Sequence, residues 1–266
     1  MVPENMMAFY SDIWRNRDLI KFMVDGQQRA AVVKSVLGWL WHVLVPLSQA
    51  AIYFFLVAIV FSAGGARGDL TFITIVMGIL HYALLYHMSS FVQPAIYGNA
   101  SLLLQIKIEP AVLIAAGFFR SIRIWFNGIV VFFCFFFVLG ESFTLKAMFY
   151  PLILLLFILL TWMIGLLVAT AGVFLRDLER LLPVILQLTM YASPVIYIVD
   201  FYPEQFTYLL LFNPIASVFA LLQWSLLGAE IDVLYSVSVV LIWIFAGGVV
   251  SHAFYRWGRT RFTKVF

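Results

Sequence analysis

The sequence predicts an all-α integral membrane protein with six transmembrane helices, and three observations predict it. Of the 266 residues, 64% are hydrophobic and only 11% are charged, and the mean hydropathy is +1.04. A soluble domain has about 45–50% apolar and about 25% charged residues, so these charges are too few to cover the apolar surface of a soluble fold. Six apolar runs approach or exceed the roughly 20 residues that cross a hydrocarbon core of about 30 Å. Finally, the cations gather in segments that would lie on one side of the membrane.

The six predicted spans follow one another along most of the chain. They cover residues 38–62, 70–92, from after Pro110 to near Leu139, 149–175, 181–199 and 233–255. Five lysines and arginines precede the first span, two lie between the fourth and fifth, and four follow the sixth, whereas residues 200–232 hold none. By the positive-inside rule both termini are therefore cytoplasmic, which requires an even number of spans.

The stretch before the first span is predicted to hold an amphipathic helix over residues 5–24. Apolar and charged residues alternate there with a roughly helical period, as in helices that lie in the membrane interface. Tyr10 and Trp14 would then lie at the level of the lipid headgroups. The chain is expected to divide into an N-terminal interface segment, a transmembrane domain and a cytoplasmic tail, over residues 1–37, 38–257 and 258–266.

The outer segment near 203–228 holds two apolar runs that are each too short to cross the membrane. Asn213-Pro214 separates them, and the residue before a proline disfavours the helical conformation. We expect two short re-entrant helices that dip into the outer leaflet and return. Backbone at that depth must be covered by protein, so these helices should pack on a neighbouring helix.

The third span contains two arginines, Arg120 and Arg123, which share one helix face because they are three residues apart. Counted back from Leu139 at 1.5 Å per residue, both fall near the inner boundary of the bilayer. Two interpretations remain open for them. They anchor the span at that boundary, or they contact an anionic lipid headgroup or a substrate phosphate.

The sequence shows no constellation of residues that would perform catalysis. It has no phosphate-binding P-loop, and its four histidines lack metal-ligand spacing, so we expect no catalytic residue, no metal site and no cofactor in this chain. Its 16 cations are too dispersed to indicate nucleic-acid binding. The acidic residues at the membrane lie at the ends of spans, which argues against a proton-driven pump. A partner is therefore expected to supply energy for any transport.

A short cytoplasmic helix near 94–108 is the candidate contact with that partner. The segment lies between the second and third spans and has an amphipathic pattern that is too short to cross the membrane. Such a helix suits docking into a groove of another protein; the alternative is a plain connector. The candidate coupling residues are Tyr97, Asn99, Leu102 and Lys107.

Five motifs, taken in order, resemble the permeases of polysaccharide export, which are the membrane subunits of type 2 ABC exporters for O-antigen, capsule and teichoic acid. They are RDLI at 17–20 with KSVLGWLW at 34–41 and LVPL at 44–47, GNASLL at 98–103, VFLRD at 173–177, YASPVIY at 191–197, and FNPI at 212–215. The resemblance covers nearly the whole chain. The chain departs from the family where Ile108-Glu109-Pro110 replaces a frequent phenylalanine–proline pair, and where Asp25-Gly26-Gln27-Gln28 stands in place of more basic residues.

The resemblance implies that two copies form a homodimer around a continuous channel in the bacterial inner membrane. A lipid-linked polysaccharide would enter laterally between spans one and five and move outward, past a mouth shaped by the re-entrant pair. A separate, dimeric ATPase subunit would bind ATP and Mg and dock on the helix near 94–108, so this chain would be a transport subunit and not an enzyme. O-antigen of lipopolysaccharide is the predicted cargo, and a capsule polysaccharide or teichoic acid is the alternative.

Aromatic side chains of spans one and five are candidates for the channel wall, because rings can pack on the apolar faces of sugars without fixing one register. They are Trp39, Trp41, Tyr53, Phe54, Tyr191 and Tyr197. Alternatively, these rings anchor the spans in the interface or face lipid. Ser193-Pro194 either kinks span five and opens a lateral gap or is simply tolerated there.

Four cations near the N-terminus are candidates for contact with a pyrophosphate-linked headgroup. They are Arg17, Lys21, Arg29 and Lys34. Anionic lipid of the inner leaflet is an equally good partner for them.

Three other functions stay open. The first is an exporter of small drugs or lipids, although such exporters usually have a different fifth-span motif and often a large outer domain. A membrane enzyme acting on polyprenyl-phosphate-linked substrates would need a charged surface cluster, for which residues 176–180 are the candidate, although a charged inner turn is their simpler interpretation. A structural membrane subunit without transport is the third.

Overall fold

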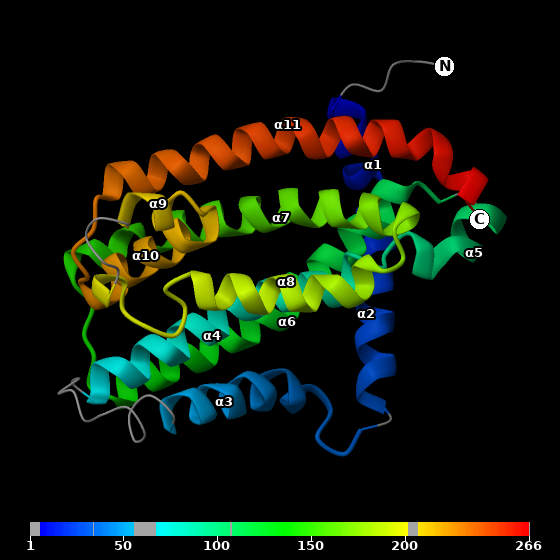
Figure 1. Cartoon of the computed structure of the whole chain (residues 1–266). Coiled ribbons are helices and arrows are strands. Elements are labelled where there is room, and N and C mark those ends of the chain that lie inside the picture. Colours follow the sequence, from blue (N-terminus) through cyan, green and yellow to red (C-terminus); the bar gives the residue numbers. More distant parts are fainter. Residues whose placement is uncertain (1–5, 34, 56–67, 107, 202–206, 266) are drawn as a thin grey trace.

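The computed structural model describes residues 6–33, 35–55, 68–106, 108–201 and 207–265, and over these ranges the chain is built of helices and turns without a strand. This confirms the predicted all-α class. The α-helices are α1 (Met6–Arg15), α2 (Arg17–Val33), α3 (Trp41–Phe54), α4 (Gly68–Phe91), α5 (Ala100–Gln105), α6 (Pro110–Val138), α7 (Tyr150–Phe174), α8 (Leu178–Ala192), α9 (Thr207–Leu211), α10 (Pro214–Leu227) and α11 (Val233–Val265) (Figure 1).

Four helices of the described chain are long and apolar enough to cross a membrane. They comprise Phe72–Phe91 of α4, Pro110–Val138 of α6, Leu145–Phe174, which is α7 with the 3-10 helix that precedes it, and Val233–Phe262 of α11. They correspond to predicted spans two, three, four and six and confirm a multi-pass membrane protein.

The predicted first and fifth spans contain shorter helices. α3 has 14 residues and α8 has 15, which at 1.5 Å per residue measure about 21 and 22 Å, less than the roughly 30 Å hydrocarbon core. Residues 56–62 of the predicted first span lie outside the described residues. α8 begins three residues before the predicted fifth span and ends at Ala192 instead of Val199. Crossing by these two segments stays a prediction.

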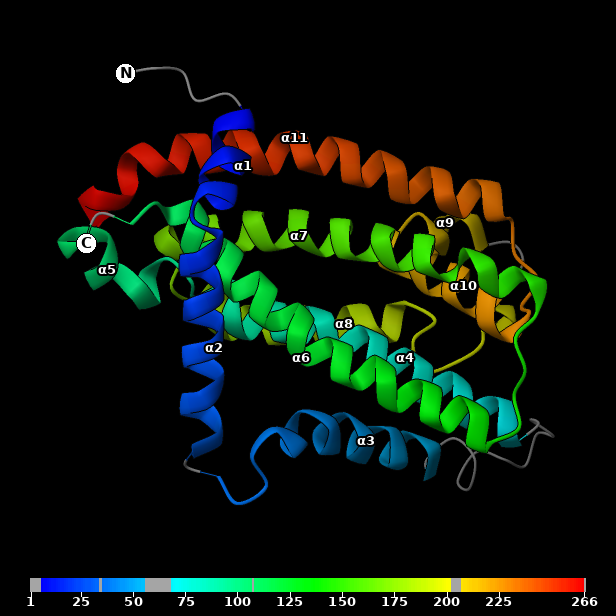
Figure 2. The same ribbon diagram turned by 180° about the vertical axis from the view of Figure 1, so that it is seen from behind.

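α4 lies at the centre of the bundle. In its most apolar stretch 72% of the residues are buried, against 17% in α11, which lies at the edge and packs on α7 and α10 (Figures 1 and 2). The fully buried rings of Tyr82, Phe157 and Phe219 join α4, α7 and α10, and the ring of Phe219 lies 5.8 Å from each of the other two. α4 also packs against α3, α6 and α8.

Local sequence signals set the bounds of α6 and α10. Pro110 and Pro214 each begin a helix, where the missing N–H of proline has no intrahelical partner to lose. Asn213 caps α10 by accepting a hydrogen bond from the Ile215 N–H at 3.0 Å. Gly228 ends α10 with a φ of 77°, a left-handed conformation that glycine adopts without strain. The predicted break at Asn213-Pro214 therefore separates α9 from α10, while insertion of this pair into the outer leaflet stays a prediction.

The predicted N-terminal amphipathic helix is two helices, α1 and α2, which meet at Asn16. The Asn16 side-chain N–H donates to the Asp12 carbonyl at 2.8 Å and closes the turn between them. α2 crosses the long helices instead of running along them (Figure 2), as expected of a helix at a membrane surface. Its buried Ile20 and Val24 pack on the first turns of α6, whereas the indole of Trp14 is 71% exposed.

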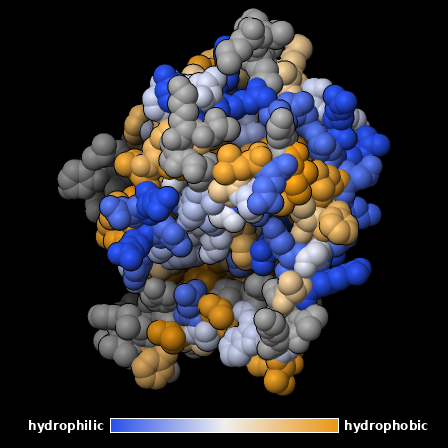
Figure 3. All heavy atoms as spheres, turned by 90° about the vertical axis from the view of Figure 1, so that its right-hand side faces the viewer, coloured by the Kyte–Doolittle hydropathy of each residue, from blue (hydrophilic) through white to orange (hydrophobic). Residues whose placement is uncertain are grey.

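One end of the bundle carries α1, α5 and the last turns of α11 (Figure 1). Figure 3 views that end and shows many hydrophilic side chains there. α9 and α10 lie toward the opposite end (Figures 1 and 2). Both described ends of the chain thus lie on one side of the bundle.

Candidate functional site

Two motifs that are distant in sequence meet at the end of α8. The Asn213 side-chain N–H donates to the hydroxyl oxygen of Ser193 at 3.0 Å, and Ser193 is fully buried. The same Asn213 caps α10. The YASPVIY and FNPI segments therefore form one polar contact, which joins the turn after α8 to the start of α10. Ser193-Pro194 follows the end of α8 rather than kinking it, since the helix ends at Ala192.

Gln223 of α10 holds the backbone that follows α8. Its side-chain N–H groups donate to the carbonyls of Pro194 at 2.7 Å and Tyr197 at 2.8 Å, and its side-chain oxygen accepts from the Val199 N–H at 2.8 Å. Gln223 is fully buried, so three polar backbone groups that have left the helix depend on one amide. No sequence motif predicts the role of Gln223; its one local signal is an amide side chain inside the apolar run 214–227.

The turn after α8 lies directly on α4. A β-carbon at Gly78 would overlap the carbonyl group of Val195, so this close approach requires glycine. One α-helical turn further along α4, the Tyr82 hydroxyl donates to the Leu186 carbonyl of α8 at 2.6 Å. The central helix α4 thus fixes both α8 and the turn that follows it.

Among the candidate channel aromatics of the predicted first span, the structure shows the surroundings of Trp41, which begins α3. Its half-exposed indole lies at a hollow of about 310 Å³ between α3 and α4, lined also by Gln49, Tyr86 and His87. Tyr191, which is also half-exposed, belongs to α8, and α8 packs against α4. The structure thus places an aromatic and polar surface on α3, α4 and α8, to which Tyr86 and His87 belong although no sequence motif predicts them.

Of the remaining channel candidates, the structure gives a contact for Tyr197. The Tyr197 hydroxyl donates to the Tyr191 carbonyl at 3.1 Å, so this ring folds back on the end of α8. The side chains of Trp39, Tyr53 and Phe54 lie outside the described part of the structure.

The candidate coupling residues lie at the end of the bundle that carries α5. The Tyr97 hydroxyl donates to the Glu179 carboxylate on α8 at 3.0 Å and lies 3.2 Å from the Gln93 side-chain oxygen. Burial, followed by the neighbouring Glu179 carboxylate, raises the pKa of Tyr97 to about 12. This tyrosine therefore keeps its proton at neutral pH and connects the segment before α5 to the first turn of α8.

The short helix α5 and the residue that follows it present apolar side chains outward. Leu104 and the C-cap residue Ile106 are exposed, and Leu102 is partly exposed. Asn99 stabilises the turn before the helix by donating to the Ala95 carbonyl at 2.8 Å. Exposed apolar groups on a protruding helix suit contact with a partner. Lys107 lies outside the described residues.

The two arginines of α6 contact α2. Arg123 forms an ion pair with Asp25, and the hydrogen bond from its guanidinium group lowers the pKa of that carboxyl. Arg120 donates to the Gln27 side-chain oxygen at 3.2 Å, and its guanidinium carbon lies 3.9 Å from the centroid of the Phe91 ring. The structure thus gives both arginines a role that neither sequence interpretation included, which is to hold the N-terminal interface helix against α6.

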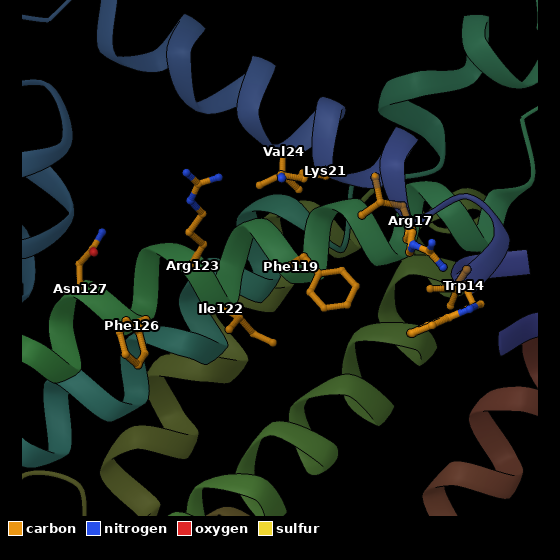
Figure 4. Close-up of a pocket in the computed structure, with 11 residues that line it drawn as sticks. Trp14, Arg17, Lys21, Val24, Phe119, Ile122, Arg123, Phe126 and Asn127 are labelled. Atoms are coloured by element: carbon orange, nitrogen blue, oxygen red, sulfur yellow. The ribbon is translucent and has the colours of Figure 1, made fainter. Parts of the chain in front are cut away.

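A groove opens between the N-terminal helices and α6 (Figure 4). Its volume is about 580 Å³. Of the predicted headgroup cations, Arg17 and Lys21 line it, whereas Arg29 lies elsewhere on α2 and Lys34 lies outside the described residues.

The charged segment 176–180 comprises the turn after α7 and the first residues of α8. Its Glu179 accepts the hydrogen bond from Tyr97, which gives this carboxylate a structural contact. Nowhere in the described ranges do three or more histidine, cysteine, aspartate or glutamate residues lie close enough to hold a metal ion.

Comparison with known proteins gives two relatives over most of the chain. Both are named O-antigen export system permease protein RfbA and both come from Klebsiella pneumoniae. One is 26% identical over 250 residues, which are 93% of this chain and 95% of the relative, and the other is 26% identical over 232 residues, which are 84% and 88%. No family model matches the chain. The similarity to these permeases confirms the resemblance that the motifs indicate.

Proposed function

We propose that this chain is the permease subunit of an ABC exporter that carries a lipid-linked O-antigen polysaccharide across the bacterial inner membrane. The observation that carries the proposal is the similarity to O-antigen export permeases over 93% of the chain. Four membrane-crossing helices agree with such a role. The chain is then a transport subunit, and a separate ATPase subunit hydrolyses ATP with Mg.

The proposed topology has six spans with both termini in the cytoplasm. α3 and α8 would contribute the first and fifth spans, each completed by the residues that follow it. Because α1, α5 and the end of α11 lie at one end of the bundle, we assign that end to the cytoplasm. α9 and α10 would then form the re-entrant pair at the outer mouth.

The channel is proposed to form between two copies of the chain, along the surface that carries Trp41, Tyr86 and Tyr191. These rings are exposed or partly exposed on α3, α4 and α8. Aromatic faces pack on the C–H faces of sugars, and packing without fixed hydrogen bonds lets a polymer slide. The Gln223 amide would hold the backbone at the outer end of this surface.

Purification of the chain from native membranes in mild detergent tests the proposal. We expect an ATP-hydrolysing subunit to elute with the chain in equal amount, with an activity that responds to added lipid-linked glycan. Deletion of the gene should leave lipid-linked O-antigen inside the cell and remove it from the surface. Elution of the chain without an ATPase, or unchanged surface polysaccharide after deletion, would refute the function.

Replacing Tyr97 with phenylalanine should weaken the coupling of ATP hydrolysis to transport. Tyr97→Phe keeps the ring and removes the hydroxyl that contacts Glu179. A hydrogen bond worth roughly 0.5–1.5 kcal/mol corresponds to a fall in export of about twofold to 13-fold. ATP hydrolysis by the purified complex should persist, because the ATPase site is in the partner.

A double-mutant cycle with Glu179→Ala provides the control. If the contact itself matters, the variant that carries both changes should export no less than either single variant. Additive losses would mean that the two side chains act independently and that the Tyr97–Glu179 contact does not transmit motion.

A further inference from the structure

We propose that the groove between the N-terminal helices and α6 binds one anionic phospholipid of the inner leaflet. Its phosphate would lie at Arg17 and Lys21, and an acyl chain would lie along α6. The groove has a volume of about 580 Å³ and is bounded by α1 and the first half of α2 on one side and by the middle of α6 on the other (Figure 4). The inference rests on the proposed topology, which puts the N-terminal helices at the cytoplasmic surface, and does not depend on what the protein transports.

The charges that line the groove favour an anion. Of its eleven lining residues three are cations and none is acidic. Arg123 is paired with Asp25, and the charge of Lys21 also acts on that carboxyl. Arg17 and Lys21 are both exposed, so a ligand can reach them. The Arg17 guanidinium carbon lies 5.1 Å from the centroid of the Trp14 ring, and this cation–π contact holds it beside the groove. Cations at the inner membrane surface attract anionic headgroups.

The walls of the groove favour a hydrocarbon chain. Phe119, Ile122 and Phe126 lie along one side of α6 (Figure 4), over about 10 Å of helix at 1.5 Å per residue. The ring of Phe126 is 60% exposed. Seven of the eleven lining residues are aliphatic or aromatic, and Asn127 is the one amide in the lining, so the walls beyond the cations present the hydrocarbon surface that an acyl chain needs.

The charged and apolar ends of the groove lie at the depths at which a membrane lipid has its phosphate and its acyl chain. α2 crosses α6 near the end of the bundle that carries α5 (Figure 2), where Ile20 and Val24 pack on Val112 and Ala115. Phe126 lies farther along α6, deeper in the span. A lipid in the groove therefore has its phosphate at the surface helix and its chain directed toward the bilayer centre.

Native mass spectrometry of the purified chain with added phosphatidylglycerol tests the site, and phosphatidylcholine with the same acyl chains is the neutral comparison. We expect one phosphatidylglycerol retained per chain. Each cation near the surface is worth about a fivefold change in binding, so Arg17→Gln with Lys21→Gln should weaken retention about 25-fold. The unchanged chain should retain phosphatidylcholine only weakly. This retention should be about as low as that of phosphatidylglycerol by the double variant.

The control variant carries Arg15→Gln and Arg29→Gln, which remove the same amount of charge from the end of α1 and from α2, outside the groove. It should retain phosphatidylglycerol as the unchanged chain does. Equal loss in both double variants would mean general attraction to the helices and would overturn the site. Equal retention of the two lipids by the unchanged chain would overturn it as well.

A second pair of variants tests the apolar wall. Phe126→Ala should lower retention severalfold, whereas Phe137→Ala, which changes an exposed ring of α6 outside the groove, should not; equal behaviour of the two would overturn the proposed chain position. Polyprenyl phosphate in excess should leave phosphatidylglycerol bound. Its displacement would assign the groove to a polyprenyl-linked lipid and refute a phospholipid site.

Discussion

Gly78→Ala is expected to destabilise the chain strongly and to abolish export. The new β-carbon would overlap the Val195 carbonyl, which belongs to the backbone and cannot move aside as a flexible side chain would. Overpacking typically costs about 1–3 kcal/mol and more when backbone must shift. For a chain of this size a loss of about 3 kcal/mol lowers the melting temperature by roughly 6–12 °C, which thermal unfolding in detergent would measure.

The expected loss of export has a separate reason. Val195 belongs to the turn that follows α8, so relief of the clash must push this turn away from α4 and disturb the contacts that Ser193 makes with α10. Surface polysaccharide in cells that express the variant measures this effect. A variant that folds normally in detergent and still fails to export would locate the defect in this turn.

Gly248→Ala is the matched control for Gly78→Ala. Gly248 also lies inside a membrane-crossing helix, α11, but a β-carbon there meets no atom within 4 Å. Alanine in place of a helical glycine gains about 0.5–1 kcal/mol. The control should therefore be at least as stable as the unchanged chain. If both variants behave alike, the close approach at Gly78 is not what makes glycine necessary.

The helical class and four of the spans were predictable from sequence because they depend on local properties. A run of about 20 apolar residues with few charges is sufficient evidence for a membrane-crossing helix, and the runs over α4, α6, α7 and α11 meet that condition. The start of α10 was predictable for the same reason, since Asn213-Pro214 is a local break. The separation of α1 from α2 at Asn16 was not, because a roughly periodic pattern continues across it.

The polar contacts depend on tertiary structure, and no local pattern predicted them. Arg123 and Asp25 are 98 residues apart in the chain, and Arg259 and Glu109, which form an ion pair at 2.6 Å, are 150 apart. Asp25 and Glu109 each supply a carboxylate to an arginine of a membrane-crossing helix, a role that becomes visible only once the helices are packed.

Gln223→Met is expected to lower stability and to weaken export. Methionine has a similar length but cannot replace the amide that binds Pro194, Tyr197 and Val199. A buried backbone group left without a partner costs about 1–3 kcal/mol, although hydrogen bonds inside membranes average nearer 0.6 kcal/mol. Three lost contacts thus predict a decrease in the free energy of unfolding of about 2 kcal/mol or more, measurable by thermal unfolding.

Ser225→Ala is the control that distinguishes the loss of the Gln223 amide contacts from the loss of any buried polar group in α10. Ser225 is a second fully buried polar residue of α10, but its hydroxyl donates only to the Leu222 carbonyl of the same helix, at 3.0 Å. Its loss leaves no backbone group of another segment without a partner, so the melting temperature should change little. Gln223→Met would then be distinguished by increased protease cleavage after α8, because the backbone at 194–199 loses its anchor. Unchanged cleavage there would show that Gly78 and Ser193 hold this turn without the amide.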